Sequence, residues 1–115
     1  MNSPITTHVL DTAQGHPAEG VPVILEIRTP KGEWKRLADA ETDKNGRVAA
    51  LLGEHHRLEA GTYLMTFKTA AYFTRQKIKG FYPAVTVLFE VTDPTQHYHI
   101  PLLLSPYGYS TYRGS

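Results

Sequence analysis

The stretch HYHIPLLLSPYGYSTYRGS, residues 97–115, decides the predicted fold. Its first half alternates as a β-strand does, because successive side chains of a strand face opposite sides. The predicted core face carries Tyr98, Ile100, Leu102 and Leu104. The other face carries His97, His99, Pro101 and Leu103. Since this second face is also partly apolar, we expect it to be covered, and a second subunit is the cover that we predict.

The end of the stretch is predicted to form a returning strand. Pro106 and Gly108 mark a turn, after which the chain comes back beside the strand that carries the histidines. In the returning strand, Tyr112 and Arg113 are expected on opposite faces.

Alternation recurs upstream in three stretches, which are VPVILEIR (21–28), GTYLMTFK (61–68) and AVTVLFEV (84–91). Gly, Pro, Asn and Asp gather between the predicted strands, as turns require, at 14–20, 29–33, 43–46 and 92–96. Asn45-Gly46 is the strongest hairpin signal, because both residues tolerate a positive φ. Residues 69–77 are the predicted short helix. These patterns predict a mainly β protein, a two-sheet antiparallel sandwich with one short helix.

The first predicted strand, ITTHVLD at 5–11, carries a further histidine. If Val9 faces the core, His8 and Leu10 face outward. An imidazole therefore again stands beside an apolar neighbour on an outer face. Asp11, which ends this strand, is expected to form a turn rather than to act as an acid.

Length and charge limit the classes of function. The 115 residues suit one domain, 1–115, with one hydrophobic core. The net charge is +1 and the Lys and Arg residues are scattered, so neither nucleic acid nor a membrane is a predicted partner. There is no cysteine, and no apolar run approaches the roughly 20 residues of a membrane span. We expect a cytoplasmic protein, or a periplasmic one if a signal peptide has been removed.

Three motifs resemble the transthyretin-related proteins: HVLD at 8–11, DKNGR at 43–47 and HIPLLLSPYGYSTYRGS at 99–115. The closing tetrapeptide, Tyr112 to Ser115, is the signature of the branch of that family that hydrolyses 5-hydroxyisourate. The resemblance spans the whole chain and implies a prealbumin-like sandwich. It also implies a homotetramer, built as a dimer of dimers, with active sites in the channel between dimers.

The implied activity is a ring opening in urate degradation, for which no cofactor is expected. Water attacks a carbonyl of 5-hydroxyisourate, the adjacent C–N bond breaks, and the product is 2-oxo-4-hydroxy-4-carboxy-5-ureidoimidazoline. The family resemblance implies that the catalytic residues are His8, Arg47 and His99. The residues predicted to bind the substrate are His97, Tyr112, Arg113, Gly114 and Ser115.

The residue types suit this chemistry. Histidine titrates near neutral pH, so His99 is the predicted general base, and His8 would orient the water or pass a proton to the leaving nitrogen. Which histidine deprotonates the water stays open, because neighbouring imidazoles can titrate as a coupled pair. Arg47 offers a planar fork of donors for the charge that develops on the attacked carbonyl. Arg113 is expected to anchor the tail by a salt bridge.

Other interpretations of the same residues stay open at this point. His97 and His99 also fit two solvated strand residues, and Arg47 fits a polar residue after a turn. Two imidazoles on one face also fit zinc ligands, but zinc needs at least a third ligand and no clear one is identifiable, so no metal is predicted. The remaining loop histidines, expected in solvent, are His16, His55 and His56.

The alternative function is that of a transthyretin-like carrier, which would hold a flat aromatic ligand in the same channel. Within the family, transthyretin itself lacks these histidines and the closing tetrapeptide. A carrier needs no acid–base set, so His8, Arg47 and His99 favour the hydrolase.

Overall fold

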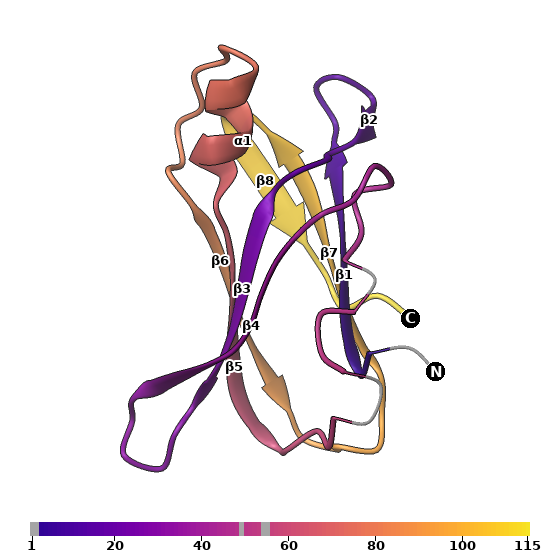
Figure 1. Ribbon diagram of the computed structural model, residues 1–115, viewed down its shortest axis with the longest axis vertical. Helices are drawn as coiled ribbons and strands as arrows, with labels where there is room; N and C mark the ends of the chain where they lie inside the picture. The colour runs from indigo at the N-terminus through magenta and orange to yellow at the C-terminus, as the bar shows by residue number, and fades with distance from the viewer. Residues whose placement is uncertain (1–2, 49, 54–55) are drawn as a thin grey trace.

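The computed structural model describes residues 3–48, 50–53 and 56–115. In this part of the chain, eight strands and one helix build two facing layers (Figure 1). In chain order the elements are β1 (Ile5–Asp11), β2 (His16–Pro17), β3 (Pro22–Arg28), β4 (Trp34–Glu41), β5 (Gly61–Phe67), α1 (Thr69–Arg75), β6 (Val85–Val91), β7 (Tyr98–Ser105) and β8 (Gly108–Thr111). One sheet has the strand order β2-β1-β7-β8, and the other has the order β4-β3-β5-β6. The predicted two-sheet sandwich is therefore confirmed.

The hydrophobic core lies between the two sheets. Residues of β1 alternate strictly between buried and half-buried positions, as a strand with one covered face should. Large side chains that are fully buried come from both sheets, among them Tyr63, Phe67, Ile5, Leu25, Met65, Leu102 and Leu104. Each such side chain contributes about 1.5–3 kcal/mol on burial, so the alternating faces fix the register of both sheets.

One strand pair differs from the antiparallel prediction. β1 runs parallel to β7, from Ile5 opposite Tyr98 to Asp11 opposite Leu104. The four strands of the second sheet separate β1 from β7 along the chain, so no hairpin fixes their relative direction. The remaining strand pairs of both sheets are antiparallel. The sheet that carries the histidines is therefore mixed.

The predicted hairpin at Asn45-Gly46 forms as a turn but not as a pair of strands. The amide of Gly46 donates to the carbonyl of Asp43 at 2.9 Å, and Gly46 alone of the predicted pair has a positive φ, of 76°. A Cβ at Gly46 would also collide with the carbonyl oxygen of Val9, so glycine is required here for two reasons. β4 ends at Glu41, before this turn, and after the turn Arg47 forms an isolated antiparallel bridge with His8. The turn therefore joins Arg47 to β1.

α1 lies at one end of the sandwich (Figure 1) and ends two residues before the predicted limit. Lys77 adopts a φ of 58°, and its amide bonds to the carbonyl of Thr74 at 3.0 Å. The amide of Ile78 bonds to the carbonyl of Phe73, also at 3.0 Å. This pair of bonds is a Schellman motif, which closes the helix after Arg75. In the described ranges, no helix is long and apolar enough to cross a membrane.

Candidate active site

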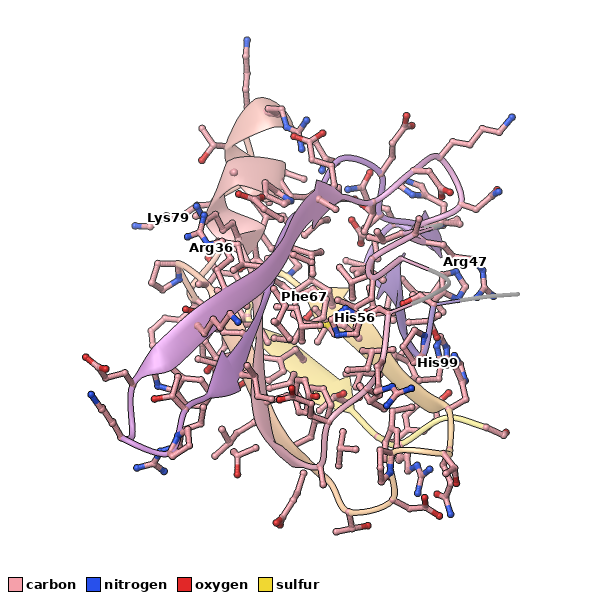
Figure 2. All side chains as sticks on the ribbon, turned by 60° about the horizontal axis from the view of Figure 1, so that its bottom comes forward. Arg36, Arg47, His56, Phe67, Lys79 and His99 are labelled. Carbon is pink, nitrogen blue, oxygen red and sulfur yellow. The ribbon has the colours of Figure 1, made fainter. Side chains whose placement is uncertain are left out.

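A cavity of about 430 Å³ lies on the outer face of the sheet β2-β1-β7-β8. Its lining residues are Thr6, Thr7, Asp43, Arg47, Val48, His97, His99 and Ser115. Figure 2 shows the labelled Arg47 and His99 on the same side of the molecule. Four of the predicted site residues, from three distant parts of the sequence, therefore line one cavity: Arg47, His97, His99 and Ser115.

His99 is half-buried on β7, and its pKa is lowered from the ordinary value of 6.5. Burial is the main cause, and the positive charges of Arg47, His97 and His8 add to it. A hydrogen bond to the backbone of Thr6 opposes the shift. The lowered pKa favours the neutral imidazole of His99, which is the state that a general base requires.

The end of the chain packs directly against His99. The amide of Gly114 donates to the carbonyl of His99 at 2.8 Å, and the two residues form an isolated antiparallel bridge. A Cβ at position 114 would stand 2.6 Å from Cδ2 of the imidazole. Glycine is therefore needed in the closing tetrapeptide because the ring of His99 occupies the space of a side chain. This contact also brings Ser115 to the cavity.

Pro101 interrupts the pairing between β7 and the tail. The register that puts Leu102 opposite Thr111 puts Gly114 opposite His99, so Tyr112 falls opposite Pro101. Proline has no amide hydrogen to donate, and β8 ends at Thr111. The hydroxyl of Thr111 instead donates to the carbonyl of Pro101 at 2.7 Å. Residues 112–113 thus form a gap in an otherwise continuous register.

Tyr112 and Arg113, in this gap, lie away from the histidine cavity in the single chain. They line a separate cavity of about 340 Å³, between β6 and β7. The guanidinium of Arg113 lies over the ring of Tyr98, 4.4 Å from its centroid, and donates to Gln96 Oε1 at 2.9 Å. Among the described residues, Arg113 is anchored by these neutral partners and not by the predicted salt bridge.

His8 lies beside the cavity, although it is not one of the lining residues described above. Its backbone bridges Arg47, and the amide of Val9 donates to the carbonyl of Gly46 at 2.8 Å. Its charge contributes to the lowered pKa of both His99 and Asp43. His8 is therefore close enough to act electrostatically on the site.

The predicted site included neither Asp43 nor Thr6, which both line the cavity. Asp43 Oδ1 accepts from the amides of Asn45 at 2.8 Å and Arg47 at 3.0 Å, and these bonds are the main causes of its lowered pKa. The charges of Arg47 and His8 act in the same direction, against desolvation. An Asp two residues before Asn-Gly is a known turn-capping signal that could have identified it. The other residue is Thr6. Alternation predicts that its side chain faces outward, but it does not predict the contact of Thr6 with His99.

His16 and His56 are exposed, as predicted, and His55 lies outside the described residues. Within the described ranges, no group of three His, Cys, Asp or Glu residues is placed to hold a metal ion. The closest nitrogens of His97 and His99 instead converge on the hydroxyl of Thr6.

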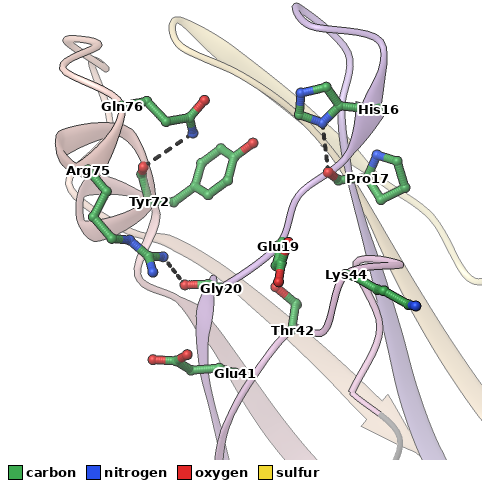
Figure 3. A pocket seen from close by; sticks show the side chains of 10 residues that line it. All are labelled: His16, Pro17, Glu19, Gly20, Glu41, Thr42, Lys44, Tyr72, Arg75 and Gln76. Atoms are coloured by element: carbon green, nitrogen blue, oxygen red, sulfur yellow. Dashed lines mark hydrogen bonds between the residues drawn. The ribbon is translucent and has the colours of Figure 1, made fainter.

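A larger cavity, of about 600 Å³, lies between α1 and the segments around Gly20 and Thr42 (Figure 3). Figure 3 shows Arg75 bonded to the carbonyl of Gly20 and Gln76 bonded to the carbonyl of Tyr72. Its acidic and basic side chains are mixed, and it contains none of the predicted catalytic residues. Size alone therefore does not identify the site, and the histidine cavity is the better candidate.

Fold and cavity together define a transthyretin-like sandwich that carries an imidazole- and arginine-lined site on the outer face of one sheet. Residues 5–114 match the model of the HIUase/Transthyretin family, and the chain belongs to this family. This confirms the resemblance drawn from the three sequence motifs.

Both 5-hydroxyisourate hydrolases and a transthyretin are among the proteins that this chain resembles. A 5-hydroxyisourate hydrolase of Salmonella dublin is 45% identical over 114 residues, which cover 99% of this chain and 82% of the relative. The solved structure of Klebsiella pneumoniae 5-hydroxyisourate hydrolase matches with a TM-score of 0.85 and 36% identity, over 100% of both chains. Sea bream transthyretin, solved in complex with thyroxine, matches with a TM-score of 0.90 and 33% identity, over 96% of this chain and 94% of that one.

Proposed function

We propose that this protein is a hydrolase that opens the ring of 5-hydroxyisourate in urate degradation. The observation that carries the proposal is the cavity that brings His99, whose pKa is lowered, together with Arg47. The 45% identity to a hydrolase of this name, over nearly the whole chain, supports the same activity. A base and a cation at one site are what the hydrolysis of a cyclic amide requires.

In the proposed reaction, His99 accepts a proton from water as the water oxygen attacks a ring carbonyl. The negative charge that develops on the carbonyl oxygen is stabilised by the guanidinium of Arg47, and one such donor is typically worth about 3–4 kcal/mol of barrier. The adjacent C–N bond then breaks, and the leaving nitrogen takes up a proton. His8, which bridges Arg47 through its backbone, is the proposed donor of that proton.

The closing residues are proposed to bind the substrate and to keep the base in place. Gly114 holds the ring of His99 by close packing, and Ser115 brings a hydroxyl to the cavity. In a single chain Tyr112 and Arg113 face another cavity, so any contact that they make with substrate requires a second subunit.

We also propose the homotetramer, a dimer of dimers with its sites between dimers. Half-buried Leu10 and Leu103 stand beside the site on the outer face. Leu88 and Tyr112 are 64% and 59% exposed, which is a large apolar area for an isolated chain. Light scattering coupled to size-exclusion chromatography tests this, since a tetramer has four times the 12.9 kDa of one chain. A monomeric mass would contradict it.

A carrier of a flat aromatic ligand is the second candidate. The observation in its favour is the TM-score of 0.90 to a transthyretin that was solved with thyroxine. Backbone similarity of this kind defines the fold and not the activity, because function depends on the side chains of the site. The lowered pKa of His99 beside Arg47 is of use to a hydrolase and has no purpose in a carrier.

The test generates 5-hydroxyisourate in place from urate and urate oxidase and follows its absorbance with and without this protein. Run in water labelled with heavy oxygen, hydrolysis places a single labelled atom in the new carboxylate of the product. Accelerated decay with this labelled product supports the hydrolase. Decay at the spontaneous rate, with saturable binding of thyroxine, would favour the carrier.

A further inference from the structure

One hydroxyl group lies between two imidazoles in the candidate site. Thr6 Oγ1 is 2.8 Å from His99 Nδ1 and 3.2 Å from His97 Nε2. We propose that Thr6 is a positioning residue that sets the tautomer of His99 and links His99 to His97 for proton transfer. The proposal rests on the proposed hydrolase function, and it gives His97 a role that the sequence left open.

The backbone of the sheet fixes this arrangement. The parallel register of β1 and β7 places Thr6 opposite His99 on the outer face. His97 precedes His99 by two residues, so its side chain points to the same side. The neighbouring pairs, Ile5 with Tyr98 and Thr7 with Ile100, are buried and hold the two strands together. Threonine is also β-branched, which restricts the directions that its hydroxyl can take.

A hydroxyl has a single proton, so Thr6 can donate to only one of the two imidazoles. In the first arrangement His99 Nδ1–H donates to Thr6, and the hydroxyl donates to His97 Nε2. In the second arrangement the hydroxyl donates to His99 Nδ1, and His97 Nε2–H donates to Thr6. The bond at one ring nitrogen determines which nitrogen carries the proton, so Thr6 couples the tautomers of both rings.

The first arrangement is the one that suits a general base. It leaves Nε2 of His99 without a proton, and Nε2 has no hydrogen-bond partner among the side chains that the structure describes. The second arrangement would place a proton on Nε2, where it would block uptake of the proton from water. Gly114 packs against Cδ2, the ring carbon next to Nε2, and so fixes the direction of that nitrogen.

His97 is the proposed acceptor of the proton that leaves His99 through Thr6. As His99 Nε2 takes a proton from water, the Nδ1 proton passes to Thr6 and the hydroxyl proton passes to His97 Nε2. Afterwards Thr6 has its hydroxyl again, His99 is neutral with its proton on Nε2, and His97 is the cation. Charge and proton number are conserved throughout. His8 protonates the leaving nitrogen, and the reverse transfer restores both imidazoles once Nε2 of His99 releases its proton to solvent.

The electrostatics of the site favour this direction of transfer. His99 is half-buried and Arg47 and His8 both disfavour a positive charge on it, whereas His97 is exposed to water. The charged side chains that line the cavity are Arg47 and Asp43. Moving the cation from His99 to His97 thus moves it from a desolvated position to a hydrated one.

The first test compares Thr6→Val, which removes the hydroxyl and keeps the shape, with Thr6→Ser, which keeps the hydroxyl. Thr66→Val, the same change on β5 of the other sheet, is the matched control. We expect kcat to fall between about tenfold and a hundredfold in Thr6→Val, because a base in the wrong tautomer is inactive. Thr6→Ser should stay within about threefold of wild type, since it retains the bridging hydroxyl. Equal losses in the Val and Ser variants would overturn the proposal.

The second test needs no substrate, so it stays informative even if the hydrolase function is wrong. Heteronuclear NMR of the ring nitrogens should show the Nδ1–H tautomer of His99 in wild type and Thr6→Ser. In Thr6→Val the signals should move toward the Nε2–H tautomer. A wild-type Nε2–H tautomer, or unchanged signals in Thr6→Val, would overturn the proposal whatever the activity.

The link to His97 is tested by a double-mutant cycle. His97→Gln should lower kcat in the wild-type background. It should have little further effect in Thr6→Val, because that variant already lacks the hydroxyl that links His99 to His97. An equal loss in both backgrounds would show that His97 does not act through Thr6. If wild type itself fails to accelerate decay of the substrate, the proposed function fails, while the NMR result still decides the tautomer.

Discussion

Gly114 and His99 are in such close contact that a Cβ on the glycine would stand 2.6 Å from the imidazole. The amide of Gly114 is bonded to the carbonyl of His99 at the same place. Gly114 therefore packs against His99, the proposed base, and restricts the position of its ring. This contact explains why a tail residue without a side chain belongs to the site.

Replacing Gly114 by Ala should displace the ring of His99 and lower kcat by at least about tenfold, because small misplacements of a reacting group are costly. Stability should change little, since Gly114 does not have a positive φ. Gly53→Ala is the matched control, because no atom lies within 4 Å of a Cβ at that position. Steady-state kinetics and thermal unfolding check both variants, and full activity in Gly114→Ala would contradict the packing argument.

Arg47→Lys keeps the charge but loses the planar fork of donors. If Arg47 stabilises the developing oxyanion, kcat should fall by about a hundredfold, while KM changes less. The thermal midpoint should stay close to that of wild type, because the side chain of Arg47 is exposed. Arg36→Lys, in an exposed ion pair with Asp39 at 3.2 Å, is the control that should leave kinetics unchanged. A rise in KM alone would assign Arg47 to ground-state binding instead.

The pH dependence of kcat/KM should report the lowered pKa of His99. Because the base acts in its neutral form, activity should be complete at neutral pH and should fall as the pH drops through the lowered pKa. The midpoint of this acid limb is therefore expected below 6.5, the ordinary value for histidine. The rate would be measured between about pH 5 and pH 8, with spontaneous decay subtracted at each pH. A midpoint above 6.5 would show that His99 is not the titrating base.

A buried hydrogen bond away from the site should affect stability and not activity. The hydroxyl of Tyr72 donates to Asp11 Oδ2 at 2.7 Å, and Asp11 is 1% exposed. Tyr72→Phe should therefore lower the free energy of unfolding by about 2 kcal/mol, because a bond to a buried carboxylate is lost. Tyr107→Phe, at a position 69% exposed, should have almost no effect. Chemical denaturation of both variants measures the difference.

The same tyrosine predicts a loss of stability in alkali. Burial, followed by the bond to Asp11, raises the pKa of Tyr72 to about 12, from an ordinary value of 10.0. The neutral phenol is therefore favoured in the folded state, and its contribution is complete below pH 10. As the pH rises from 10 toward 12, the unfolded chain ionises first and this contribution is lost. Tyr72→Phe should show a shallower loss of stability than wild type over this range.

Alternation in the sequence was enough to predict β1, β3, β5, β6 and β7 and the face that each buries, but β2 and β4 were not predicted. Tyr98, Ile100 and Leu102 are buried as expected, and Asp11 caps a turn through the amides of Ala13 and Gln14. Alternation carries no information on which strands pair or in which direction, so the parallel pairing of β1 with β7 was not predictable.

The parts of the site that were missed depend on that pairing. The contact of Thr6 with His99 exists only in the parallel register of β1 and β7. Similarly, the separate position of Tyr112 and Arg113 follows from the gap that Pro101 makes in the pairing with the tail. Motifs in the sequence identified the residues, but only the three-dimensional register shows which of them share a cavity.

The most direct test of the proposed hydrolase compares wild type with His99→Ala in the decay of 5-hydroxyisourate. Thermal unfolding of the variant is measured alongside, to show that the fold is intact. We predict fast decay with wild type and decay near the spontaneous rate with the folded variant, since loss of a general base typically costs about a hundredfold or more. Equal acceleration by both proteins would exclude His99 as the base. Spontaneous decay with both would contradict the hydrolase itself.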